Sequence, residues 1–165
     1  MMDGPEVVRG SIPSAHEKTG LFSSRTWTLV ITDRRLLLAQ ATSELTKAAI
    51  EQARAERQDA GGGFLSQWKG QLHASMHFAE RYAAMTPDAI LAETAGNLAL
   101  TPPEVRTVKV ERKTEGGGED SVDREHLRIT LETTGGKRTF NTDDETPRLA
   151  DARALLAATF GPAVR

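Results

Sequence analysis

The chain contains the segment LVITDRRLLL at residues 29–38, in which a polar four-residue stretch separates two apolar runs. Before that stretch, Trp27, Leu29 and Ile31 alternate with Thr and Val residues. Such period-two alternation is typical of β-strands. Asp33 favours a turn, because its carboxylate can accept hydrogen bonds from nearby backbone amides. Residues 25–40 are therefore predicted to form a β-hairpin.

The composition changes after this hairpin. From residue 41 to about residue 95 the chain is rich in Ala, Glu, Gln and Arg and nearly free of β-branched residues, which is typical of helices. Capping residues, a Pro at a first helical position and glycines divide this block into three segments. We expect a helix capped by Thr42 or Ser43 and running to about Asp59, a second over about 64–84, and a third that begins at Thr86-Pro87-Asp88 and ends at Gly96.

The strand pattern returns beyond the Pro102-Pro103 pair. Strands are predicted over about 104–113 and over 126–133, with a Gly135-Gly136 turn leading into a further strand that contains Phe140. A strand is also expected within 5–13. The last element is predicted to be a helix that is capped by Thr146, begins at Pro147 and ends at Gly161-Pro162. Strands and helices segregated in this way favour the α+β class over a βαβ repeat.

These elements together resemble bacterial PH-like and GRAM-like domains. The similarity lies in the Thr-Asp-x-Arg turn of 29–38, the strand that follows Pro102-Pro103, the hairpin 126–140 and the helix 146–160. It covers about 25–40 and 100–160. It implies an α+β fold in which 1–165 is one PH-like domain, a bent antiparallel β-barrel with a C-terminal helix and an inserted helical segment at 41–98. An α+β sandwich of unrelated topology is the alternative.

Composition limits the classes of function. The 165 residues include 21 Lys and Arg against 23 Asp and Glu, with a net charge of −2 and no cysteine. A generally basic nucleic-acid binder is not expected, and thiol catalysis and cysteine-ligated metal are excluded. The sequence carries neither a phosphate-binding Gly-Lys-Ser/Thr ending nor a Gly-x-Ser-x-Gly motif. We predict a cytoplasmic, non-enzymatic protein with no cofactor.

Two groups of side chains have the chemistry of metal ligands. His73, His77 and Glu80 share one side of a predicted helix, but no His-Glu-x-x-His core is present, so a polar helix face is the favoured interpretation. The acidic run Asp143-Asp144-Glu145 precedes the last helix. Carboxylates in that position usually complement the helix dipole, and we favour that role over metal binding.

Two further groups could bind a partner. PH-like folds bind phosphoinositides, peptides or other proteins, and the fold alone does not decide among them. The leading prediction is a scaffold that contacts a protein partner or a second copy through an apolar stripe on the inserted helices, made of Phe64, Trp68, Leu72 and Met76. The alternative is a membrane-surface module that binds anionic lipid through Arg25, Arg34 and Arg35, with additions from Lys109, Arg112 and Lys113.

Overall fold

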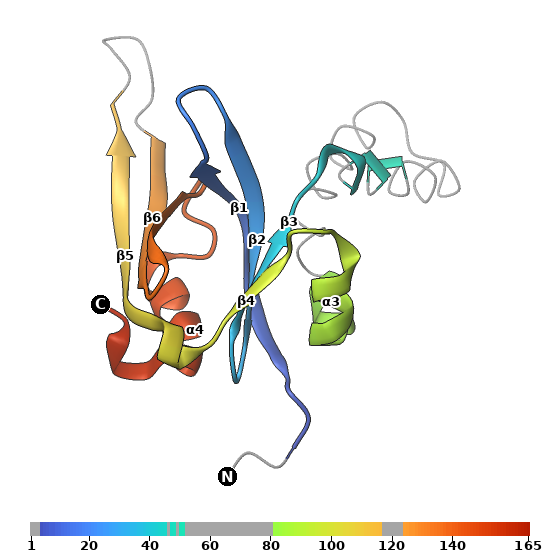
Figure 1. The fold of residues 1–165 in the computed structure, drawn as a ribbon. Helices are drawn as coiled ribbons and strands as arrows, with labels where there is room; N and C mark the ends of the chain where they lie inside the picture. The colour runs from blue at the N-terminus through green and yellow to red at the C-terminus, as the bar shows by residue number, and fades with distance from the viewer. Residues whose placement is uncertain (1–3, 46, 49, 52–80, 117–123) are drawn as a thin grey trace, which may run out of the picture.

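The structure is a computed structural model, and it describes residues 4–45, 47–48, 50–51, 81–116 and 124–165. Seven antiparallel strands, two α-helices and three short 3-10 helices have defined bounds (Figure 1). The strands are β1 (Val8–Lys18), β2 (Ser24–Thr32), β3 (Leu36–Gln40), β4 (Leu98–Leu100), β5 (Val105–Glu115), β6 (Arg124–Thr133) and β7 (Gly136–Asn141). The helices are η1 (Arg81–Ala84), α3 (Pro87–Glu93), η2 (Pro102–Glu104), α4 (Leu149–Phe160) and η3 (Gly161–Ala163).

The strands form one sheet in the order β4-β3-β2-β1-β7-β6-β5. The sheet is strongly curved, so that β5 and β6 lie on one side of the molecule and β2, β3 and β4 on the other (Figure 1). The two halves join where β1 pairs with β7, and the only register pair at that seam in the described residues is His16 with Asn141. The predicted α+β class is therefore confirmed.

The main core fills the concave side of this sheet. Alternate residues of each strand point into it, including Leu29 of β2 and Ile129 of β6, both of which are fully buried. Helix α4 packs into the same space through Ala152, Leu156 and Phe160. The period-two pattern that predicted the strands thus also selects the residues that form the core.

A second core lies on the opposite, convex face of β2 and β3. Val30, Leu37 and Ala39 are buried there beneath Tyr82 of η1 and Ile90 of α3. For this reason both faces of the hairpin 25–40 are apolar. Helices η1 and α3, which belong to the predicted insertion 41–98, therefore pack on the sheet.

Two other predicted helix starts agree with the structure, although α3 ends at Glu93 and not at Gly96, and the strand expected within 5–13 extends to Lys18. Thr86 caps α3, because its side-chain oxygen accepts a hydrogen bond from the backbone N–H of Ala89. Thr42 accepts one from Leu45, at the start of a helical segment over 43–51 of which 46 and 49 are not described. Of the second helix, predicted over about 64–84, the structure describes only the last residues, which form the 3-10 helix η1, and 64–80 lie outside the described residues.

The sheet is bent and antiparallel, as expected, but it does not close into a barrel. Strands β4 and β5 form the two edges of the sheet and do not pair with each other. The chain passes between them through η2, where Pro102 and Pro103 have no N–H to donate to a strand ladder. β4 is also only three residues long. The result is an open, curved sheet whose interior is filled by α4.

The predicted start of the last helix is also wrong. Helix α4 begins at Leu149, after Thr146 and Pro147. The N-cap residue is Arg148, whose side chain makes no capping hydrogen bond. The pKa of the nearby Glu145 is lowered mainly by Arg112 and in part by the backbone N–H of Leu149, the first residue of α4. A negative charge at this position complements the helix dipole, which is the role favoured for the acidic run 143–145. Across the described residues, no helix is long and apolar enough to cross a membrane.

Candidate functional site

The turn between β2 and β3 carries Arg34 and Arg35, two of the predicted anion-binding residues. The guanidinium of Arg35 forms an ion pair with Glu6 at 2.9 Å and a second with Asp88 of α3 at 3.3 Å. Arg34 donates to the backbone carbonyl of Gly4. Arg35 is thus engaged by two carboxylates of this chain, and those charges oppose the binding of an external anion.

Thr32 is the centre of the same turn and is fully buried. Its hydroxyl donates to a Glu6 carboxylate oxygen at 2.7 Å and accepts from the backbone N–H groups of Arg34 and Arg35 at 3.1 and 2.9 Å. The backbone N–H of Val7 donates to Asp33 at 2.9 Å. The Thr-Asp-Arg-Arg sequence therefore ties the chain before β1 to the turn.

Arg25, the third predicted anion-binding residue, lies far from the other two. It is the second residue of β2, whereas the turn follows Thr32 at the other end of that strand. Seven residues of extended chain separate them by about 23 Å. Arg25 instead lies over the Trp27 ring, with its guanidinium carbon 5.6 Å from the ring centre. The three arginines do not form one site.

The basic residues expected to extend that site lie on β5. Lys109 and Lys113 both approach Glu111, at 3.1 and 3.5 Å. The hydrogen bond from Lys109 and the two positive charges lower the pKa of Glu111. Arg112 forms an ion pair with Glu145, which lies just before α4, at 2.6 Å.

The remaining predicted sites are the apolar stripe, the histidine set and the acidic run 143–145. The stripe Phe64, Trp68, Leu72 and Met76 and the set His73, His77 and Glu80 lie outside the described residues. Over 4–45, 81–116 and 124–165, no group of three or more His, Asp or Glu side chains is arranged to hold a metal ion. In the acidic run, Asp143 accepts a hydrogen bond from the His16 ring at 2.6 Å, which links it to β1.

An apolar tip stands at the end of the β1–β2 hairpin, and sequence reasoning missed it. Leu21 and Phe22 have 96% and 103% of their reference area exposed to solvent. The loop beneath them is closed by hydrogen bonds from the backbone N–H groups of Thr19 and Gly20 to the Ser23 carbonyl, at 3.0 and 3.3 Å. The sequence signal that could have indicated this feature is an apolar pair, Leu21-Phe22, between Gly20 and Ser23. We call Leu21 and Phe22 the apolar tip.

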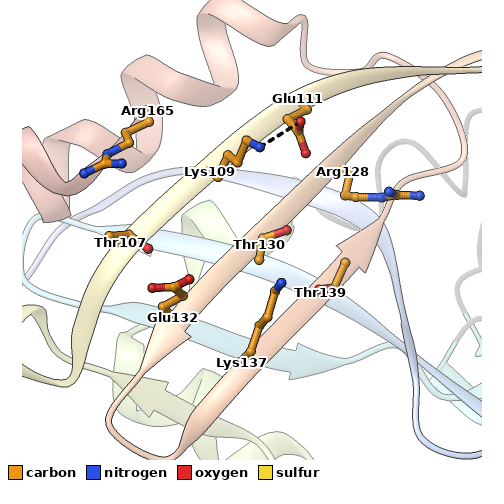
Figure 2. Close-up of a pocket in the computed structure, with 9 residues that line it drawn as sticks. All are labelled: Thr107, Lys109, Glu111, Arg128, Thr130, Glu132, Lys137, Thr139 and Arg165. Atoms are coloured by element: carbon orange, nitrogen blue, oxygen red, sulfur yellow. Dashed lines mark ion pairs between the residues drawn. The ribbon is translucent and has the colours of Figure 1, made fainter.

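A polar hollow of about 390 Å³ lies on the outward face of β5, β6 and β7. Figure 2 shows its side chains standing above the three strands, with Thr130 near the middle. Successive side chains of a strand point to opposite faces of the sheet. The residues that alternate with the lining residues of the hollow are buried in the core. The hollow is lined by Thr107, Lys109, Glu111, Arg128, Thr130, Glu132, Lys137, Thr139 and Arg165.

The sequence contained the signal for this hollow only in part. Arg128, Thr130 and Glu132 are the polar partners of the apolar alternation predicted for 126–133, and the structure places them on the outward face. That β5 and β7 flank them, and that Arg165 lies beside β5, depends on strand pairing. The backbone N–H of Arg165 donates to the Val108 carbonyl at 2.8 Å.

The comparisons with known proteins add no assignment. No protein-family model matches this chain, and no curated protein or solved structure matches it either.

Proposed function

We propose that this chain is a non-enzymatic, PH-like interaction module that contacts a protein partner or a second copy of itself. The PH-like part of the proposal is supported by a curved antiparallel sheet whose concave side is filled by a C-terminal helix, α4. The interaction part is supported by the apolar tip. Folded proteins rarely leave two adjacent large apolar side chains fully exposed without a use for them.

The apolar tip carries the proposal. Covering one Leu or Phe side chain is worth about 1.5–3 kcal/mol, so a partner that covered both would gain appreciable binding free energy. The closed loop beneath the tip holds both side chains outward before binding, which limits the entropy lost on contact. The stripe of 64–76, predicted from its spacing, is proposed as a second contact surface of the same module.

A photo-crosslinking experiment tests this proposal. Benzoylphenylalanine placed at Phe22 in cells that make the protein should give a discrete crosslinked product, either a doubled mass or one partner of fixed mass. Benzoylphenylalanine at Trp68 tests the stripe. Benzoylphenylalanine at Val7, which is 46% exposed, is the control. Leu21→Ser should remove the product formed at position 22, because half of the apolar contact is lost.

The proposal fails if neither position 22 nor position 68 gives a product above that of position 7. It also fails for the tip, and stands for the stripe alone, if only position 68 crosslinks.

A membrane-surface function is the second candidate, because Lys18 and Arg25 flank the apolar tip in the β1–β2 register. Basic residues near an apolar tip favour anionic lipid surfaces, each contributing up to about 1 kcal/mol at low salt. If this function holds, Arg25→Gln and Phe22→Ser should each weaken binding to vesicles rich in phosphatidylserine severalfold. Added salt should weaken the binding of the unaltered chain as well.

The matched variant in this vesicle experiment is Arg34→Gln, at the other end of β2, which should bind as the unaltered chain does. Equal loss for Arg34→Gln and Arg25→Gln, or no binding at low salt, would rule out a membrane contact at the tip.

A further inference from the structure

The polar hollow on β5, β6 and β7 has a regular arrangement of positive charge. Strand register places its side chains in three rows across the sheet, and each row contains one cation. The rows are Thr107–Glu132–Lys137, Lys109–Thr130–Thr139 and Glu111–Arg128–Asn141. Successive rows are two residues apart along the strands, which corresponds to about 6.7 Å.

This spacing matches the repeat of an extended peptide. Side chains on one face of an extended chain also recur every two residues, at about 6.7 Å. A segment lying along β6 would therefore present one side chain to each row, and the cation of that row would reach it from its own strand: Lys137 from β7, Lys109 from β5 and Arg128 from β6. Threonine hydroxyls between these cations can both donate and accept hydrogen bonds.

Positive charge exceeds negative charge in the hollow. The cations on the three strands, Lys109, Arg128 and Lys137, face two carboxylates, Glu111 and Glu132. Glu111 is already shared by Lys109 and Lys113. Within the described part of the chain, neither Lys137 nor Arg165 has an ion pair, and Arg128 donates only to Asn141, at 3.1 Å. Since the chain as a whole carries −2, this excess is local.

The same lining argues against a nucleic acid as the occupant. None of the nine lining residues is aromatic, so bases would find no stacking surface. The two carboxylates would also repel closely spaced phosphates. A peptide carries fewer negative charges than a nucleic acid of the same length, and its uncharged residues can lie beside Glu111 and Glu132.

We propose that the polar hollow binds an extended acidic peptide segment of a protein partner, with carboxylates at alternate positions contacting Lys137, Lys109 and Arg128. This inference rests on the proposed function only in taking a protein as the partner, since the hollow and the apolar tip are separate surfaces.

Fluorescence anisotropy with a labelled probe peptide tests the inference. The probe alternates Glu and Thr over about eight residues, long enough to pass all three rows. It should bind the full chain at low salt and weaken as salt is added. The variant with Lys137→Glu and Arg128→Glu should bind it at least about tenfold more weakly, because two contacts become repulsive.

Three controls make the result decisive. The same number of charge reversals at exposed positions away from the hollow, Arg9→Glu with Lys47→Glu, should leave probe binding within about twofold. A variant of the tip, Leu21→Ser with Phe22→Ser, should also bind the probe normally, so that failure of the tip and failure of the hollow are told apart. A probe alternating Lys and Thr should not bind.

The inference is overturned if the chain does not bind the Glu-Thr probe at low salt. It is equally overturned if the Arg9/Lys47 variant loses as much affinity as the hollow variant, since net charge alone would then explain binding. Binding of a thymidine oligonucleotide of similar length more tightly than the peptide would replace the peptide by a nucleic acid and overturn it as well.

Discussion

Glu17→Gln is expected to lower the free energy of unfolding by about 2–3 kcal/mol. The Glu17 carboxylate accepts two hydrogen bonds from Arg138 of β7, both at 2.9 Å, and a third from the Trp27 indole at 3.1 Å. These contacts reinforce the seam at which β1 and β7 join the two halves of the sheet. Thermal or urea denaturation measures the loss.

The size of this effect follows from burial. Breaking one partner of a fully buried ion pair typically costs about 3–5 kcal/mol. Here the side chains of Arg138 and Glu17 keep 26% and 13% of their area exposed, which lowers the expected cost. The control is Glu132→Gln on the outward face of β6, which should change stability by less than about 0.5 kcal/mol. Equal effects of the two substitutions would contradict a special role for Glu17.

The same ion pair predicts a pH dependence. Burial raises the pKa of Glu17, but the hydrogen bonds and charge of Arg138 outweigh it and hold that pKa below the ordinary value of 4.5. The unfolded chain therefore binds a proton more readily, so this contribution to stability is present above about pH 4.5 and is lost as the pH falls through the folded-state pKa. The stability difference between the unaltered chain and Glu17→Gln should accordingly shrink in acid.

Thr32→Val is expected to destabilise the fold by about 2–3 kcal/mol as well. Valine has nearly the same shape, so the effect comes from the hydroxyl alone. Without it, two backbone N–H groups of the β2–β3 turn lose their acceptor and Glu6 loses a donor at 2.7 Å. Polar groups left unsatisfied in a partly buried place cost about 1–3 kcal/mol.

The matched control for this prediction is Thr28→Val on the same strand. Thr28 is 1% exposed, and within the described residues its hydroxyl has no hydrogen-bond partner. Its replacement should therefore be neutral or slightly stabilising. If chemical denaturation gives the same stability for both variants, the Thr32 hydroxyl does not hold the turn.

These two contact groups explain why the predicted anion site does not form. A Thr-Asp-Arg-Arg turn suggests exposed cations when it is considered alone, since Arg35 has no acidic neighbour in the hairpin beyond Asp33. Its actual partners, Glu6 and Asp88, lie 29 and 53 residues away along the chain. Local sequence contains no information on such pairs, because they arise from the packing of α3 and of the chain before β1.

The apolar tip and the polar hollow were predictable to different degrees. The hollow uses polar positions whose alternation was visible in 126–133, but its cations come from three strands. Their neighbourhood required the pairing of β5 with β6 and of β6 with β7. The apolar tip is a local feature, yet a Leu-Phe pair in a turn is equally compatible with burial under another loop, and only the fold leaves it uncovered.

Local patterns determined most of the elements. Period-two alternation defined β2 and β6, apolar residues after a turn or a Pro pair indicated β3 and β5, and a side-chain cap defined the start of α3, because these signals act within a few residues. Tertiary structure decided the rest: whether the sheet closes, which face of the β2–β3 hairpin is covered, and which charges meet. Those outcomes depend on contacts between residues that are distant in sequence, and the free energy of such contacts appears only once the chain has folded.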